Sequence, residues 1–444
     1  MKRFSSILVF VLFAMFTFLC ISSIQADPDS KALPAGRRVL KVLKAAAMLD
    51  VESGKLIPHP VVVIEGDRIR SVEPGVSIPP DAEVIDLGEA VILPGLIDCH
   101  THVTTTYRYL LFGGPMQDAV RAPGNAKKTL ESGITTIRDL WSKDYTDVAL
   151  RDAINSGEVL GPRMLVATLA IGSTGGHNED VPGLSPTVSV NDYMGIADGV
   201  DAVRKLVRTE IKYGADVIKI MATEGGGEGD NLAVETQFTL DEMRAIVEEA
   251  HRYGKKVAAH AHGADGIKVA IRAGVDSIEH GTLLDAEAVR MMKEKGTYLV
   301  PTGYIWDYFP PEAENNESNR SPVMRERELR LKNGSRAAFH MAVEAGVKIA
   351  MGSDSSVIPH GENPKEIVWM ATHGMTALQA IRAATVQAAD LLGWSDRVGS
   401  ISKGKFADIV AVNGNPLENV ELLENVGFVM KGGVVVKNQL SNTQ

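Results

Sequence analysis

The chain has 444 residues, of which 45% are hydrophobic and 23% are charged, and its formal net charge is −10. This length allows a large buried core and is too great for one small domain, so we expect a large catalytic-type domain and a smaller one. The acidic balance argues against nucleic acid or anionic lipid as partners.

The first 26 residues predict a signal peptide, which is set apart from the fold. Lys2 and Arg3 precede an apolar run from Ile7 to Ile24, and a plausible cleavage site follows at Ala26. We therefore expect an exported protein, periplasmic or secreted, without membrane association after cleavage. An uncleaved membrane anchor is the alternative, because the apolar run is almost as long as the roughly 20 residues that span a bilayer.

Cysteine content excludes a disulfide-based fold. Only Cys20 and Cys99 occur, and Cys20 lies in the expected signal peptide. An exported chain with one remaining thiol has no intrachain disulfide. Its stability must come from its core and from any bound metal.

The two flanks of the mature chain show a β pattern. Short runs of strand-forming residues, such as "VVVIEGDRIRSVE" and "EVIDLGEAVIL", are broken by turn residues between positions 38 and 92. The same pattern returns between positions 394 and 440 in "FADIVAV" and "VGFVMKGGVVVKN". We expect both flanks to form one small β-sandwich.

Between these flanks, residues 93–393 alternate short apolar runs with helix-like segments. Thr239 and Glu242 have the spacing of a capping box, and glycines such as Gly254 and Gly274 stand where helices should end. Eight such units predict a (β/α)₈ TIM barrel, and a doubly wound open sheet is the competing architecture. The expected strands are Gly95–His100, Thr135–Leu140, Arg163–Thr168, Asp216–Met221, Lys256–Ala261, Asp276–Gly281, Thr297–Pro301 and Lys348–Asp354.

Polar side chains gather at the ends of these expected strands, which meet at one rim in a barrel. His100 and His102 end the first strand, and their spacing places both on one face. Such a pair alone is weak evidence for a metal. Lys219 lies among apolar residues of the fourth strand, where it either reaches a carboxylate or has its pKa lowered by burial.

The later strands decide between a chance pair and a metal site. His260 and His262 end the fifth strand, His280 ends the sixth and Asp354 ends the eighth. Their convergence at one rim predicts metal binding. Imidazoles with carboxylate-type oxygens suit zinc best, with manganese, cobalt or iron as alternatives.

These motifs carry a resemblance to a known family. "LPGLIDCHTH", "VIKIM", "VAAHAHG", "SIEHG" and "GSD", in this order, resemble the amidohydrolase superfamily of binuclear metal hydrolases. "STGGHNED" and "VDSIEHGTLLD" look most like the imidazolonepropionase-related group. That group includes metal-dependent dipeptidases, carboxypeptidases and relatives that cleave the amide of ochratoxin A.

The resemblance implies a site with two divalent metal ions. It makes His100 and His102 ligands of the first ion, to which Asp354 would also bind while acting as general base and acid. Lys219, as a carbamate formed with carbon dioxide, would bridge both ions. His260 and His280 would hold the second ion; His260 and His262 compete for one ligand place, and the family pattern favours His260.

Candidate substrate contacts come from loops beyond the strands. His177 matches a substrate-contacting position of the related enzymes, and His262 would face substrate if His260 is the ligand. Tyr304 follows the seventh strand and is equally explained by packing. The segment "TEGGGEGD" lacks the Lys-Ser/Thr of a phosphate loop, so a flexible active-site loop is expected there.

These observations together predict a hydrolase of carbon–nitrogen bonds. We expect an exported dipeptidase-like or carboxypeptidase-like enzyme that acts on small-molecule amides, namely dipeptides or N-acyl amino acids. Hydrolysis of a cyclic amide, as by imidazolonepropionase, is the alternative reaction. A non-catalytic binding protein is the alternative of another class, although the ligand set is complete in the sequence. The sequence leaves the oligomeric state open, a homo-oligomer included.

Overall fold

A computed structural model describes residues 40–74, 78–105, 114–179, 185, 194–225, 235–308 and 322–440. The expected signal peptide, residues 1–26, lies outside the described residues and stays a prediction. All of these described residues belong to one compact unit. Among the helices that the structure describes, none has both the length and the apolar character needed to cross a bilayer.

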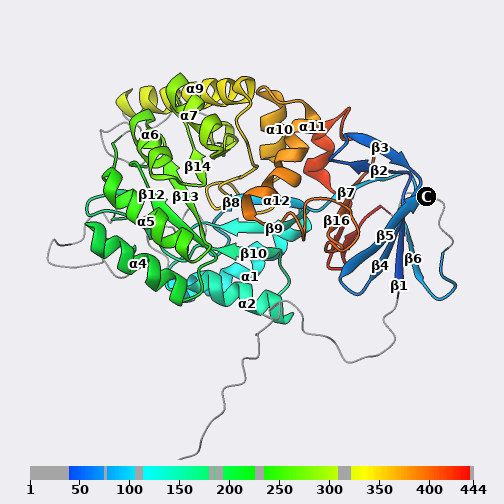
Figure 1. Cartoon of the computed structure of the whole chain (residues 1–444). Coiled ribbons are helices and arrows are strands. Elements are labelled where there is room, and N and C mark those ends of the chain that lie inside the picture. The colour runs from blue at the N-terminus through cyan, green and yellow to red at the C-terminus, as the bar shows by residue number, and fades with distance from the viewer. Residues whose placement is uncertain are drawn as a thin grey trace, which may run out of the picture. The chain divides into compact units, whose positions relative to one another are not determined.

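Two sheets are built from the flanks of the chain (Figure 1). One has four strands in the order β5-β4-β1-β6, and the other has six in the order β18-β17-β16-β7-β2-β3. Because β16 pairs antiparallel with β7, strands from both flanks share one sheet. The strands are β1 Leu40–Lys44, β2 Ala47–Asp50, β3 Lys55–Pro58, β4 Pro60–Glu65, β5 Arg68–Pro74, β6 Glu83–Asp86, β7 Val91–Pro94, β16 Ile409–Val412, β17 Phe428–Lys431 and β18 Val434–Asn438.

One hydrophobic cluster joins these two sheets. Leu43 and Val62 come from the four-stranded sheet, and Ile92, Ile409 and Phe428 come from the six-stranded sheet. All five side chains are fully excluded from solvent. Burial of apolar surface, worth about 25 cal/mol per Å², therefore holds the sheets together.

The middle of the chain forms two sheets in which every strand pair is parallel, in the orders β10-β9-β8 and β11-β12-β13-β14-β15. Seven of the eight expected strands are present, and β11 is an additional short one. The strands are β8 Leu96–Thr101, β9 Ile134–Asp139, β10 Arg163–Val166, β11 Ala170–Ile171, β12 Val217–Met221, β13 Lys256–Ala261, β14 Ser277–His280 and β15 Tyr298–Val300.

The expectation of an eighth strand at Lys348–Asp354 was wrong. The structure has only isolated bridges there, from Ile349 to β15 and from Ser355 to β8. The segment changes partner half-way: Ala350 N donates to Leu299 O at 3.0 Å, and Cys99 N donates to Met351 O at 2.8 Å. No continuous ladder can form along it, although it connects the two parallel sheets.

The other edges of the two parallel sheets are also joined. Asp216, which precedes β12, donates its backbone N–H to Val166 O of β10 at 2.8 Å. Backbone hydrogen bonds thus link the three-stranded and five-stranded sheets on both sides.

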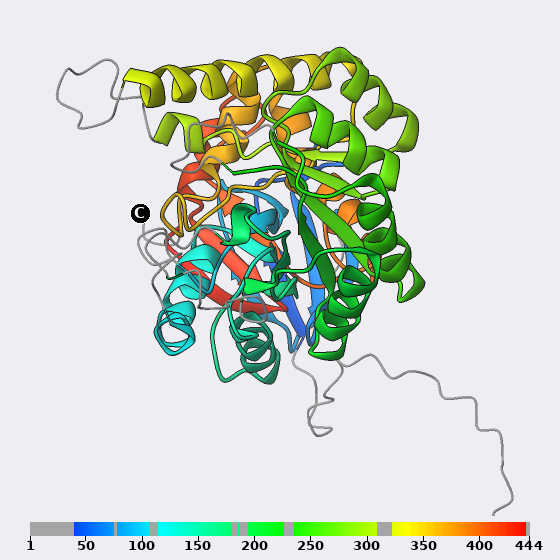
Figure 2. The same ribbon diagram turned by 90° about the vertical axis from the view of Figure 1, so that its left-hand side faces the viewer.

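Helices follow the parallel strands and lie outside them, as α4 to α7 show beside β12 to β14 in Figures 1 and 2. The predicted capping box of Thr239 and Glu242 is confirmed, and Gly274 ends α6 at a φ of 98°. The helices are α1 Pro115–Glu131, α2 Thr146–Ser156, α4 Val200–Lys212, α5 Leu240–Arg252, α6 Ala264–Ala273, α7 Ala286–Lys295, α8 Ile305–Tyr308, α9 Pro322–Ala345, α10 Lys365–Thr372, α11 Ala377–Ala383 and α12 Val386–Leu392, with 3₁₀ helices η2 His177–Glu179 and η4 Val420–Asn425.

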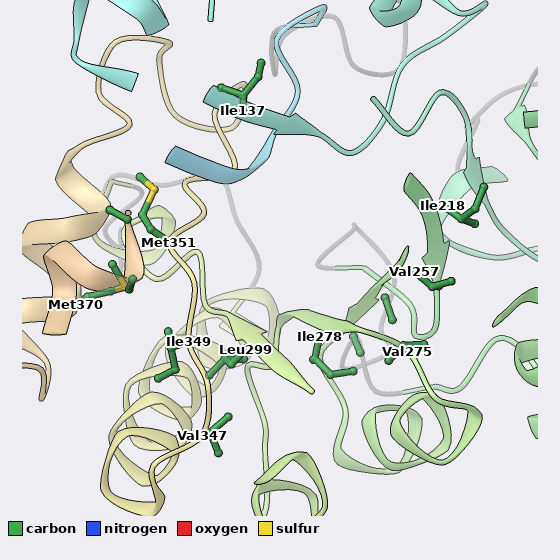
Figure 3. Close-up of a cluster of buried hydrophobic side chains, with 14 of the residues drawn as sticks. Ile137, Ile218, Val257, Val275, Ile278, Leu299, Val347, Ile349, Met351 and Met370 are labelled. Carbon is green, nitrogen blue, oxygen red and sulfur yellow. The ribbon is translucent and has the colours of Figure 1, made fainter. Parts of the chain in front are cut away.

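The largest hydrophobic cluster is built from apolar residues of successive parallel strands. Figure 3 shows Ile137 of β9, Ile218 of β12, Val257 of β13, Ile278 of β14 and Leu299 of β15, all buried. Because side chains alternate along a strand, their neighbours on the same strands face the opposite side of the sheet. The candidate site residues occupy those positions or the strand ends.

Glu210 of α4 gives this fold a predicted pH dependence. Its carboxyl is fully buried, accepts hydrogen bonds from Thr168 Oγ1 and Leu169 N, and has its pKa raised to about 7 by burial. The folded state therefore binds a proton that the unfolded state releases near pH 4.5. This contribution to stability is complete below pH 4.5 and is lost as pH rises toward 7.

We expect Glu210→Gln to flatten this decline, because glutamine keeps an acceptor oxygen and does not ionise. Between pH 5 and pH 8 the parent should lose about 1–3 kcal/mol more unfolding free energy than the variant. Urea unfolding at both pH values measures the difference. Glu248→Gln, at a side chain that is 65% exposed, serves as the control. Equal pH slopes for parent and Glu210→Gln would contradict the assignment.

Candidate metal centre

The first cluster of polar side chains combines the end of β8 with the segment after α9. His100, His102 and Asp354 are buried, and one potential ligand atom from each lies within 4.8 Å of the others. Asp354 Oδ1 is 3.0 Å from His102 Nε2 and 3.6 Å from His100 Nε2. Two imidazoles and one carboxylate thus converge, as the sequence predicted.

The second cluster contains His260 of β13, His262 just after β13 and His280 of β14, again with ligand atoms within 4.8 Å. The ring centroids of His260 and His280 are 4.6 Å apart. The ring of His100 is 4.9 Å from that of His280, so the two clusters are adjacent. The structure brings His260 and His262 into the same cluster, and both have the position of a possible ligand.

Lys219 of β12 is 1% exposed and lies near both clusters. Burial lowers its pKa to about 8, while the carboxylates of Glu279 and Asp354 act in the opposite direction. At this pKa about a tenth of the amines are neutral at pH 7. Lys219 is thus a buried amine whose surroundings favour its neutral form.

Burial favours the neutral form of three of these histidines, His100, His260 and His280. Burial, followed by the charge of Lys219, lowers the pKa of His100 to about 4. Burial and neighbouring imidazoles lower the pKa values of His260 and His280 far below the ordinary value. Neutral imidazole is the form that binds a metal.

The polar partners of these rings also fit metal binding. Metal-ligating histidines usually have their second ring nitrogen hydrogen-bonded to an oxygen, which orients the ring. Three such contacts are present: His100 Nδ1 to Glu279 Oε2 at 2.9 Å, His262 Nδ1 to Thr282 Oγ1 at 2.7 Å and His280 Nδ1 to Thr302 Oγ1 at 2.7 Å.

Within the two clusters, two buried imidazole nitrogens have no hydrogen-bond partner among the described residues, His102 Nδ1 and His260 Nε2. Leaving a buried polar atom unpaired costs about 1–3 kcal/mol, so such atoms mark places for a ligand or a cation. The set of imidazole nitrogens and one carboxylate is typical of zinc and related divalent ions. The residues present therefore fit metal ions.

His177 of η2 lies against the second cluster. Its ring stacks on that of His260 at a centroid distance of 4.6 Å, and its Nδ1 is 3.9 Å from Glu224 Oε1. Gly225 provides the space, because a Cβ atom there would lie 1.9 Å from His177 Cε1. The structure thus places His177 beside the candidate ligands.

Residues 91–436 match the model of the amidohydrolase family. The chain belongs to this family. It is 34% identical over 375 residues to the ochratoxinase of Aspergillus niger, an alignment that covers 78% of this chain and 76% of that protein. It is 25% identical over 411 residues to the imidazolonepropionase of Rhizobium rhizogenes, covering 85% and 92%.

Among solved structures, the chain resembles a Xaa-Pro dipeptidase with methionine bound in its active site. The identity is 37%, the TM-score is 0.82, and the match covers 89% of this chain and 99% of that one. Family and relatives confirm the predicted resemblance. This amidohydrolase is a metal-dependent amide hydrolase, with a TIM-barrel-like α/β fold implied by its relatives.

In this amidohydrolase, Gly225→Ala should displace His177 from His260. We expect kcat/KM to fall about 10–100-fold with metal content unchanged, because a shift of about 1 Å in a positioned group can cost a hundredfold. Steady-state kinetics and metal analysis measure both quantities. Gly124→Ala is the control, since a Cβ there meets no atom within 4 Å. Parental kinetics for Gly225→Ala would show that the position of His177 is unimportant.

Tyr304 of this amidohydrolase is half-buried, and its recorded contacts are with neighbouring protein groups. Its ring is 6.3 Å from that of Tyr308 and 5.5 Å from Lys365 Nζ, and its backbone N–H donates to Glu366 at 2.7 Å. These contacts describe packing at the end of β15. Its role toward substrate stays a prediction.

Sequence reasoning missed Glu279, which precedes His280 in β14. Burial opposes its ionisation, but Arg138 and the hydrogen bond from His100 outweigh burial and lower its pKa to about 2. The sequence held a signal for it, because Glu279 is a charged residue in the middle of an expected strand, and charged residues are rarely buried unless they are paired.

Backbone conformation at the strand ends helps to aim these side chains. His280, Thr302 and Asp354 have φ angles of 71°, 48° and 55°, in the left-handed region that non-glycine residues rarely adopt. Each such residue costs about 1–3 kcal/mol and persists because the surrounding contacts hold it. This amidohydrolase thus has strained backbone at three positions of its candidate metal centre.

Proposed function

We propose that the chain is an exported, binuclear metal-dependent amidohydrolase that hydrolyses dipeptides or N-acyl amino acids. The adjacency of two ligand clusters carries this proposal: His100 and His280, one from each cluster, have ring centroids 4.9 Å apart. Catalytic two-metal sites place their ions about 3.5–4 Å apart, which adjacent clusters allow.

In this proposal, His100, His102 and Asp354 hold one ion, and His260 and His280 hold the other. Lys219, as its carbamate, would supply further oxygen ligands. We assign His260 rather than His262 as the ligand because His260 Nε2 is buried without a hydrogen-bond partner among the described residues. His262 then faces the substrate.

The proposed architecture is a (β/α)₈ barrel at residues 93–393, beside a β-sandwich from residues 38–92 and 394–440. The hydrogen bonds that join the parallel sheets at both edges support a closed ring of strands, with the Lys348–Ser355 segment in the place of the eighth strand. The cluster shared by the two flanking sheets supports the sandwich.

When bound, the divalent ions supply Lewis-acid polarisation of the scissile carbonyl and lower the pKa of a shared water. Asp354, whose carboxylate lies within reach of His100 and His102, takes the proton of the attacking water and delivers it to the departing amine. His177 lies against His260, and His262 lies within the second cluster. Their N–H groups can donate to the carbonyl oxygen as negative charge develops on it.

The likeness to the Xaa-Pro dipeptidase and to ochratoxinase supports amides of a C-terminal amino acid as substrates. The likeness to imidazolonepropionase favours a second candidate, hydrolysis of a cyclic amide, at lower identity. Export rests on residues 1–26 alone.

One experiment tests the function. The mature chain is purified, its metal ions are counted, and it is assayed with a dipeptide library that includes Xaa-Pro, with ochratoxin A and with an imidazolone. We expect about two ions per chain and release of free amino acid, and removal of the ions by a chelator should stop turnover. Cleavage of the imidazolone alone would replace the dipeptidase proposal, and absence of metal would contradict the binuclear one.

A further inference from the structure

Behind the first ligand cluster lies a buried carboxylate that the proposed chemistry does not use, Glu279 of β14. Its side chain is fully buried, and it pairs with Arg138 of β9, which is 1% exposed. We infer that Glu279 is a positioning residue that fixes the tautomer of His100 and thereby strengthens cation binding by His100, His102 and Asp354. The inference rests on the proposed function, because it takes His100 to be a ligand.

The two oxygens of Glu279 have separate partners. Oε1 accepts from Arg138 Nη2 at 2.8 Å and from Ser277 Oγ, while Oε2 is 2.9 Å from His100 Nδ1. An ionised carboxylate can only accept hydrogen bonds, so His100 must carry its proton on Nδ1. The lone pair is then on Nε2, the atom that faces Asp354 Oδ1 at 3.6 Å.

This arrangement differs from that of the second cluster. His262 and His280 have threonine hydroxyls at Nδ1, and a hydroxyl can either donate or accept. Those contacts orient the rings without dictating which nitrogen is protonated. Glu279 therefore prepares the first cluster for a cation in a way that the second cluster does not share.

Arg138 holds Glu279 in this role. Its guanidinium donates from Nε to Cys99 O, from Nη1 to Ser277 Oγ at 3.1 Å and from Nη2 to Glu279. One planar guanidinium thus donates to three acceptors on β8 and β14. The ammonium of lysine cannot reproduce this geometry. The carboxylate is fixed before any ion arrives.

Glu279→Gln is the decisive variant. An amide can present its NH₂ group to Nδ1, which would favour the wrong tautomer, and it carries no negative charge. We expect about 10–100-fold weaker zinc affinity for one of the two ions, and an unchanged affinity for the other. Competition with a chromophoric chelator measures both affinities, and the visible spectrum of the cobalt-loaded protein should change for one ion.

Glu249→Gln is the matched control. Glu249 of α5 is buried too, at 1% exposure, and pairs with arginines as Glu279 does. Its charged partners are Arg204, Arg208 and Arg252, and no candidate ligand is among them. Its zinc affinities should equal those of the parent. A milder variant, Ser277→Ala, removes one hydrogen bond to Glu279 and leaves the charge, so a smaller loss of affinity is expected if Glu279→Gln fails to fold.

The outcomes separate this inference from the proposed function. Parental zinc affinities and cobalt spectra in Glu279→Gln and Ser277→Ala would overturn the positioning role while the metal site stands. A parent protein that binds no divalent ion would overturn the proposed function itself. Equal losses in Glu279→Gln and Glu249→Gln would show a general effect of buried charge, which also overturns the inference.

Discussion

Replacing His100 by alanine is expected to remove at least one metal ion per chain and to lower turnover by more than about a thousandfold. The imidazole lies 3.6 Å from Asp354 and 4.9 Å from the ring of His280, so its loss affects both clusters. Lewis-acid stabilisation is worth several kcal/mol, and about 4 kcal/mol corresponds to a factor of a thousand in rate.

Elemental analysis and kinetics on the same preparation check this result, with thermal unfolding to show that the variant is folded. His340→Ala is the control, because the His340 side chain is 60% exposed and pairs with Glu344 on the surface of α9. If His100→Ala kept both ions and the full rate, the ligand assignment would be wrong.

The second large effect is expected for Asp354→Asn. Asparagine has the same shape but cannot take up a proton, so kcat should fall about 10²–10⁴-fold, the usual contribution of a general base or acid. The variant should keep more of its metal than His100→Ala, because His100 and His102 remain. Burial raises the pKa of the Asp354 carboxyl, but the imidazoles of His100 and His102 outweigh burial and hold it below its ordinary value, so the rate difference should persist from neutral to mildly acid pH.

Measuring kcat over a pH series, beside the metal content at each pH, separates proton transfer from metal loss. Asp241→Asn is a suitable control, since the Asp241 side chain is 82% exposed on α5. A parental kcat in a metal-loaded Asp354→Asn would mean that another group moves the proton.

Much of the candidate site could be predicted from sequence because parallel strands bring their carboxyl ends to one edge. His100, His260 and His280 lie at or near the carboxyl ends of segments that are strands in the structure, as expected. The order of strands and helices along the chain was enough to predict that these three histidines lie together. The strand period of two, however, places His260 and His262 on one face, and it cannot say which of them is a ligand.

Other parts could not be predicted because they depend on distant partners or on backbone conformation. Glu279 and Arg138 are 141 positions apart in the sequence, so no local pattern predicts that they form an ion pair. The Lys348–Asp354 run reads as a strand, yet Asp354 has a φ of 55°, which is incompatible with an extended ladder. The place of His177 depends on a glycine 48 residues later, Gly225.

The pairing of β7 with β16 constrains the order in which the chain can assemble. β7 ends at Pro94 and β16 begins at Ile409, so the six-stranded sheet must wait until nearly the whole chain has left the ribosome. Contacts of such large sequence separation form slowly and leave strand edges exposed in the meantime. The parallel strands in the middle of the chain can therefore form earlier than the six-stranded sheet. That sheet then joins the two flanks of the described chain.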